Sequence, residues 1–208
     1  MNLLQLAIAG AAALFLPAAA EAAAITINTP ASIGGVSGQG FVVGYSFTAS
    51  QDIRVTALGA YDAGMDGIVA DVGLFDASGT LLASTSISAS STLDGYFRFE
   101  GIESVLLTAG ATYVMGSYSN DPKAFVNANY GGLSYTVDPV ITLIRNRDLP
   151  YSSSLVYPSR EPSNTHAGSF GPNFQFEIAT AAVPEPASAA LLGAGLLCFG
   201  LAKRRRRS

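Results

Sequence analysis

The chain has 208 residues, of which 12% are charged and 49% are hydrophobic, and its formal net charge is −4. Residues 24–183 carry 13 acidic and 6 basic side chains, a net charge of −7 that gains nothing from counterion release and so excludes nucleic acid as a partner. The only cysteine, Cys198, lies near the C-terminus, so this central part has no disulfide, no zinc-thiolate set and no thiol nucleophile.

Residues 1–24 have the pattern of a cleaved secretory signal peptide. An apolar stretch runs from Leu3 to Leu16, Pro17 ends it, and Ala20-Glu21-Ala22 has the A-x-A spacing of a signal peptidase site. No Lys or Arg precedes the apolar stretch, so only the terminal amine supplies the positive charge that usually opens a leader. We therefore predict a signal helix that is removed on export. An uncleaved membrane anchor is the alternative.

Residues 25–180 are predicted to form one all-β domain, because their hydrophobic residues alternate with a period of two. Turn-forming residues separate the alternating segments at short intervals, and no stretch of ten or more residues combines helical spacing with caps. Many short antiparallel strands of this kind predict a β-sandwich of jelly-roll type. The residues expected on buried strand faces include Phe41, Val43, Tyr45, Phe47, Phe97, Phe99, Phe174, Phe176 and Ile178.

Three aspartates, Asp62, Asp66 and Asp71, lie on and around one predicted loop. Carboxylate oxygens are hard ligands that suit weak extracellular calcium sites, so these residues are candidate calcium ligands. Their spacing differs from that of an EF-hand, and Asp66-Gly67 is also a common turn pair. Calcium binding and a plain turn therefore both stay open, and no other cofactor is expected.

The segment Asp76-Ala77-Ser78-Gly79 is the clearest turn of the chain. Asp at the first turn position accepts hydrogen bonds from the backbone ahead of it, and Gly at the fourth tolerates a positive φ. We predict that it closes a hairpin between the strands on either side.

The residues that common hydrolytic mechanisms need are mostly missing. The only histidine, His166, has no G-x-S-x-G elbow to present a serine nucleophile. Glu100 and Glu103 are candidates for a glycosidase carboxylate pair, but nothing in their sequence context singles them out. We therefore expect a protein that is not an enzyme, and a matrix polysaccharide hydrolase is the alternative.

The segment 120–172 is rich in loop residues and contains four tyrosines that are candidate ligand-binding residues. Exposed aromatic rings beside amide and acid groups commonly hold sugars, through apolar stacking and hydrogen bonds. The alternative is that these rings cover the ends of the sandwich. The four residues are Tyr130, Tyr135, Tyr151 and Tyr157.

The C-terminal segment, residues 183–208, has three parts. Val183-Pro184-Glu185-Pro186 is extended, because its prolines remove backbone donors and restrict their neighbours. The apolar run from Ala187 to Ala202 would form a transmembrane helix roughly 24 Å long, which is slightly short of a hydrocarbon core of about 30 Å. A basic cluster then stops transfer and stays cytoplasmic. Its residues are Lys203, Arg204, Arg205, Arg206 and Arg207.

This three-part tail resembles the PEP-CTERM protein-sorting domain of Gram-negative, exopolysaccharide-producing bacteria. The matching residues are Pro184, Glu185 and Pro186, followed by the apolar run and the basic cluster. The resemblance implies that exosortase, a membrane cysteine transpeptidase, recognises the tail and removes it. The protein would first be anchored in the membrane and then reach the cell surface or the extracellular matrix. Such tails are also called ice-binding protein C-terminal domains, but the scattered threonines of this body predict no ice-binding face.

The body, too, resembles a known family. The segments 55–62, 71–84 and 105–116, with the closing segment 170–176, follow one another as in the DUF4082-type β-sandwich domain that many PEP-CTERM proteins contain. The likeness covers roughly residues 41–178, and the family implies a fold but no assigned activity.

Together these observations predict an exported, non-enzymatic protein of the cell envelope or the exopolysaccharide matrix. Signal peptidase and exosortase are its expected processing enzymes, and the membrane is its expected partner through the C-terminal helix. A carbohydrate-binding or adhesive module is the first alternative, with polysaccharide as the partner, and the hydrolase is the second.

Overall fold

A computed structural model describes residues 21–30, 40–120, 124, 126–127, 132–162 and 169–179. All named elements in this part are strands. Among the same residues no helix is long and apolar enough to cross a membrane. The predicted signal helix and C-terminal transmembrane helix lie outside the described residues.

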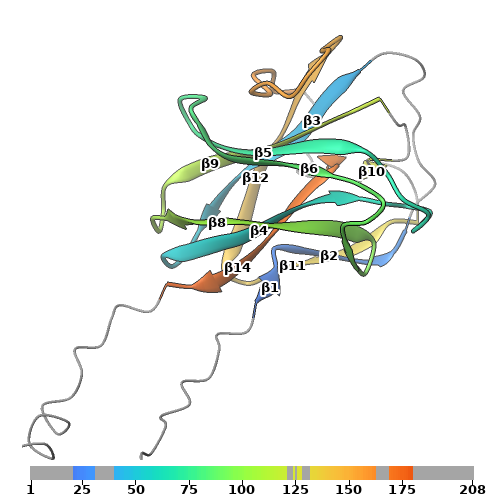
Figure 1. Cartoon of the computed structure of the whole chain (residues 1–208). Helices are drawn as coiled ribbons and strands as arrows, with labels where there is room; N and C mark the ends of the chain where they lie inside the picture. The colour runs from blue at the N-terminus through green and yellow to red at the C-terminus, as the bar shows by residue number, and fades with distance from the viewer. Residues whose placement is uncertain are drawn as a thin grey trace, which may run out of the picture.

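Two five-stranded antiparallel sheets form the body, one above the other in Figure 1. The first sheet has the order β1 (Ala22–Ala23), β14 (Pro172–Ile178), β4 (Ile53–Tyr61), β8 (Phe97–Leu107) and β7 (Thr92–Asp94). The second has the order β12 (Ile141–Pro150), β3 (Phe41–Ala49), β9 (Thr112–Ser119), β5 (Ala70–Asp76) and β6 (Leu81–Ile87). Two short pairs add β11 (Ser134–Val137) to β2 (Ile25–Thr29), and β10 (Val126–Asn127) to β13 (Ser169–Phe170). The all-β, antiparallel prediction is confirmed.

Six of the strands form three nested pairs. β3 pairs with β9, β4 pairs with β8, and β5 pairs with β6, all antiparallel. In sequence, β4 and β8 lie between β3 and β9, and β5 and β6 lie between β4 and β8. The pairs β3–β9 and β5–β6 belong to the second sheet and the pair β4–β8 to the first, so the chain passes back and forth between the sheets. Each sheet therefore offers one face to the other, and the core forms between these faces.

The core is built largely from aromatic rings of alternating strand residues. Tyr45 and Phe47 of β3 are fully buried, as are Phe174 and Phe176 of β14 in the opposite sheet. The rings of Phe47 and Phe174 lie 4.8 Å apart between centroids, which joins the two sheets directly. The predicted burial is confirmed for these residues, whereas β3 is buried on both faces and the predicted Ile178 is exposed at the end of β14. The hydroxyl of Tyr45 is buried, and desolvation raises its pKa far above the usual range of a phenol.

The predicted hairpin at residues 76–79 is also confirmed. β5 and β6 pair across it, and Gly79 has a φ of 93°. Asp76 Oδ1 accepts hydrogen bonds from the backbone amides of Ser78 and Thr80, at 2.8 and 2.9 Å. These bonds are the reason the turn needs an aspartate at its first position.

The outer face of the second sheet is covered by residues 151–160, which we call the strap. Gly44, Gly116 and Gly73 are register partners on neighbouring strands β3, β9 and β5, so a row without side chains crosses this face. A Cβ at Gly116 would come 3.2 Å from Pro158 Cδ, and a Cβ at Gly73 would come 3.0 Å from Leu155 Cδ2. The strap therefore packs where the glycines leave room.

Ion pairs hold the C-terminal end of the strap on β12. Arg160 and Asp148 exchange two backbone hydrogen bonds of 3.0 Å, and the Arg160 guanidinium also contacts both carboxylate oxygens of Asp148. The hydrogen bond and charge of Asp148 raise the pKa of Arg160 above its usual value. Glu161 then joins Arg147 at 2.7 Å and Arg145 at 3.2 Å.

Both ends of the described chain lie at one end of the sandwich, which we call the proximal end (Figure 1). Ala22 pairs with Phe176, near the last residue of β14. Ala179 donates a backbone hydrogen bond of 2.9 Å to the carbonyl of Asp52, in the turn between β3 and β4. The opposite, distal end holds the end of β9 and the starts of β3 and β5.

Candidate functional site

Asp62 is buried at the distal end of β4, where it pairs with an arginine instead of facing solvent. Its Oδ2 accepts a hydrogen bond of 2.6 Å from Arg98 Nε and one of 3.1 Å from the amide of Gly67. Arg98 Nη1 also donates to the carbonyls of Ala89 and Ser91. The pair therefore ties together the two loops that precede β5 and β7.

The three predicted calcium ligands do not converge. Asp62 is paired with Arg98, and Asp71 Oδ1 accepts a hydrogen bond of 2.7 Å from Ser86 on β6. Asp66 lies in the loop beside Gly64. Among the described residues, no three acidic, histidine or cysteine side chains stand close enough together to hold a metal ion. Calcium binding therefore stays a prediction.

The three predicted tyrosines that the structure describes have different surroundings. Tyr135 packs edge-on against Phe170, with ring centroids 4.6 Å apart, and Tyr157 packs edge-on against Phe75 at 5.6 Å. Tyr157 in addition donates a hydrogen bond of 3.3 Å to the carbonyl of Ala77. These two rings cover parts of the sandwich, as the alternative in the sequence analysis expects.

Tyr151 differs from the other tyrosines because its side chain is 79% exposed. It begins the strap at the distal end, and its φ of 62° lies in the left-handed region that side chains rarely adopt. Tyr130 and His166 lie outside the described residues. Glu103 is exposed on β8 and lines a shallow groove between β6 and β8, whereas Glu100 is half-buried.

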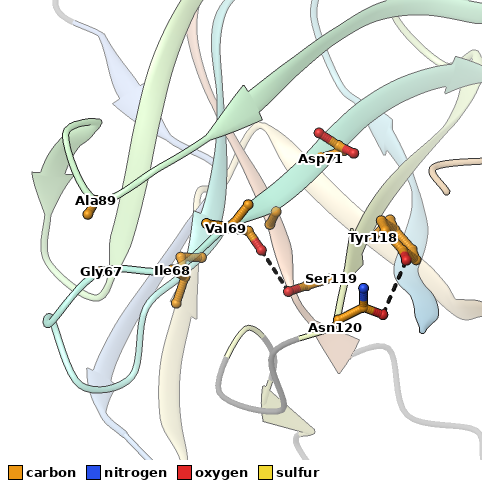
Figure 2. Close-up of a pocket in the computed structure, with 9 residues that line it drawn as sticks. Gly67, Ile68, Val69, Asp71, Ala89, Tyr118, Ser119 and Asn120 are labelled. Atoms are coloured by element: carbon orange, nitrogen blue, oxygen red, sulfur yellow. Dashed lines mark hydrogen bonds between the residues drawn. The ribbon is translucent and has the colours of Figure 1, made fainter. Parts of the chain in front are cut away.

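A pocket of about 460 Å³ opens at the distal end, between the end of β9 and the start of β5 (Figure 2). Asp71 and Tyr118 are register partners on these strands, so they stand side by side at its mouth. The Tyr118 hydroxyl donates a hydrogen bond of 3.2 Å to Asn120 Oδ1, and Ser119 Oγ donates one of 2.7 Å to the carbonyl of Val69. The side chain of Val69 is largely exposed and gives the mouth an apolar side.

The pocket is linked to Tyr151 through Gly40. A Cβ at Gly40 would come 2.6 Å from Tyr118 Cε2 and 2.3 Å from the carbonyl of Ser152, so only glycine fits between them. The amide of Ser152 donates to the carbonyl of Gly40 at 3.1 Å. The start of the strap therefore lies beside Tyr118, whereas the Tyr151 ring itself faces Phe41, with ring centroids 6.5 Å apart, and does not line the pocket.

The pocket is lined by groups that can bind a polar ligand. A carboxylate, an amide, a hydroxyl and aromatic rings can accept and donate hydrogen bonds and provide apolar surface. Among the described residues that line the pocket, none is a histidine or a cysteine. The sequence analysis did not predict Tyr118 and Asn120 as site residues. The one feature that could have indicated them is a tyrosine near the end of a strand, two residues before a turn-forming asparagine.

Comparison with protein families assigns both parts of the chain. Residues 28–168, which include the whole distal pocket, match the family model described as "Domain of unknown function (DUF4082)". The chain belongs to the DUF4082 family. Residues 182–207 of this DUF4082 protein match the PEP-CTERM protein-sorting motif, so both predicted resemblances are confirmed. A search of curated proteins finds no match.

The sorting motif of this DUF4082 protein contains the predicted Pro184, Glu185 and Pro186 together with the basic cluster Lys203 to Arg207. It implies that the protein is exported, processed by exosortase and sorted to the cell surface. These residues lie outside the part that the structure describes. The DUF4082 match stops before β14 and begins after β1, although these two strands complete the first sheet.

Proposed function

We propose that the protein is a non-enzymatic component of the cell envelope or exopolysaccharide matrix, presented with its distal end away from the membrane. The observation that carries this proposal is the position of the C-terminal exit. The amide of Ala179 donates a hydrogen bond to the carbonyl of Asp52 at the proximal end of the sandwich, which we take to be of jelly-roll type. Pro184 follows five residues later, a reach of at most about 18 Å for an extended chain.

The short connection limits how the body can lie before exosortase acts. With the apolar run from Ala187 in the bilayer, the proximal end must stay near the membrane surface. The distal pocket, at the other end of the strands, then faces the outside. The chemistry of the distal end agrees with a binding or structural role, because Asp62 and Arg98 neutralise each other.

The orientation can be tested on the protein that keeps its tail, with Pro184, Glu185 and Pro186 all changed to Ala and Cys198 changed to Ser. A fluorophore is attached to a single new cysteine, either Ala109→Cys at the proximal end or Val69→Cys at the distal end. Spin-labelled lipid head groups should quench the label at residue 109 more than the label at residue 69. Equal quenching, or stronger quenching at residue 69, would contradict the proposed orientation.

A second candidate function is carbohydrate binding at the distal pocket. The observation that favours it is that the exposed Tyr151 lies at the same end of the sandwich as the pocket, one residue before Ser152, whose backbone meets Gly40 next to the pocket residue Tyr118. Sugars are commonly held by one aromatic ring together with carboxylate and amide groups. This differs from the predicted set of four tyrosines, because Tyr135 and Tyr157 are used in packing.

Binding of the purified protein to the host's exopolysaccharide tests the second candidate. Tyr151→Ala should weaken binding about three- to tenfold, the loss of one stacking contact. Leu106→Ala is the matched control, because Leu106 is also an exposed hydrophobic residue but lies on β8 near the proximal end. Equal binding by wild type and both variants, or no binding at all, would contradict carbohydrate recognition at this pocket.

A further inference from the structure

We propose that the leader is cut between Ala20 and Glu21, so that the mature protein begins at Glu21 and keeps strand β1. The inference rests on the export that the proposed function assumes. Three A-x-A patterns overlap here, Ala18-Ala19-Ala20, Ala20-Glu21-Ala22 and Ala22-Ala23-Ala24, and spacing alone does not choose among them. The positions of residues 22–25 in the sheet distinguish the products of the three cuts, because they decide which product can fold completely.

Residues 22–24 belong to the folded body. Ala22 and Ala23 pair with Phe176 and Gln175 and form the edge of the first sheet. Ala24 is fully buried, and its amide donates a hydrogen bond of 2.9 Å to the carbonyl of Phe174. These residues close one side of the sandwich, although they precede the segment that matches the family.

Ile25, which follows Ala24, is held by hydrogen bonds from its backbone to the side chain of Asn173. The Asn173 side chain is fully buried; its Oδ1 accepts from the amide of Ile25 at 3.2 Å, and its Nδ2 donates to the carbonyl of Ile25 at 2.7 Å. Ile25 is itself 1% exposed. Both the amide and the carbonyl of Ile25 are therefore hydrogen-bonded to Asn173, and the nitrogen is a neutral amide only while Ala24 precedes it.

The alternative cuts would damage this arrangement. A cut after Ala24 would remove β1 and place a charged ammonium on the buried nitrogen of Ile25, where a neutral amide now donates to Asn173. A cut after Ala22 would leave a charged terminus at Ala23, directly before the buried Ala24. A cut after Ala20 puts the new terminus on Glu21, which is exposed.

The peptidase acts on the unfolded chain, so the sheet does not direct the cut. What the sheet determines is which product can fold completely. Of the products of the three A-x-A cuts, the one that begins at Glu21 is the one that keeps both β1 and the neutral amides of Ala24 and Ile25.

N-terminal sequencing and intact mass of the exported full-length chain test the inference. Wild type should begin at Glu21. Ala22→Val should also begin at Glu21, because a β-branched residue blocks a cut after residue 22 but suits a strand. Ala18→Asp should lose this terminus, because it removes a small residue from the first A-x-A pattern. A wild-type terminus at Ala23 or Ile25 would overturn the inference.

If wild type retained residues 1–20, this inference would be overturned, and so would the prediction that the leader is cleaved at all. That result would not contradict the proposed processing of the sorting tail, because the intact mass reports the loss of residues after Val183 separately. A second readout compares otherwise identical chains that begin at Glu21 or at Ile25. The chain that begins at Ile25 should unfold at a lower urea concentration, and equal midpoints would count against the role given to β1.

Discussion

The guanidinium of Arg98 donates hydrogen bonds to Asp62 Oδ2 and to the carbonyls of Met65, Ala89 and Ser91. Asp62 is fully buried and the Arg98 side chain is only 11% exposed, so both charges are largely removed from water. Removing one member of such a pair leaves the other charge uncompensated, which costs more than the pair itself contributes.

We therefore predict that Arg98→Leu lowers the free energy of unfolding by about 3–5 kcal/mol. Urea denaturation followed by far-UV circular dichroism measures the change. Arg54→Leu is the matched control, because Arg54 is exposed on the neighbouring strand β4 and should change stability by no more than about 0.5 kcal/mol. Similar losses in the two variants would show that the buried pair is unimportant.

Asp76 gives the hairpin at residues 76–79 a dependence on pH. Hydrogen bonds from Ser78 and Thr80 stabilise its carboxylate and lower its pKa below the usual value. A depressed pKa in the folded state means that the stabilisation is present above the usual pKa of an aspartate, about 4, and is lost as the pH falls through the folded pKa.

The comparison of wild type with Asp76→Ala at two pH values tests this effect. At pH 7 wild type should have the higher urea midpoint, because its ionised carboxylate accepts the turn's hydrogen bonds. At pH 2 to 3 the difference between the two midpoints should shrink. A difference that stays constant with pH would mean that the charge of Asp76 does not matter to the turn.

At the scale of single elements, the row of Gly44, Gly116 and Gly73 determines where the strap lies. These glycines leave a side-chain-free path across three strands, which Leu155 and Pro158 fill. A side chain at Gly116 would meet Pro158, Val42 and Phe75 at once.

Gly116→Val should displace the strap and lower the free energy of unfolding by about 1–3 kcal/mol, the usual cost of overpacking. It should also speed proteolysis between residues 151 and 160. Gly101→Val on β8 is the control, because a Cβ at Gly101 has no neighbour within 4 Å. The role of the glycine row would be refuted if the strap of Gly116→Val were as resistant to protease as that of Gly101→Val.

The alternation of residues along single strands is local, and so β3, β14 and the hairpin at 76–79 could be predicted. The strap could not, because it depends on the register that aligns Gly44, Gly116 and Gly73 across three strands. The distal pocket depends in the same way on the pairing of Asp71 with Tyr118, which lie far apart in the sequence. The pairing of Asp62 with Arg98 could not be predicted for a similar reason, because Arg98 lies on another strand.

At the scale of the whole molecule, the two chain ends and the pocket divide the sandwich into two functional ends. The proximal end holds Ala22 and Ala179, and the sorting motif begins soon after. The distal end holds the pocket and Tyr151. The sorting motif therefore follows the end of the body that lies away from the surface proposed to face the matrix, and the proposed leader cut lies at that same end.

The intact mass of the protein recovered from the membrane and from the medium of its native host tests this account most directly. Wild type should lack both the leader and the residues after about Val183. The variant with Pro184, Glu185 and Pro186 changed to Ala should keep its tail and stay in the membrane. A mature wild-type protein that retains residues 187–208 would instead be a permanent membrane protein, and the claim of sorting and display would be contradicted.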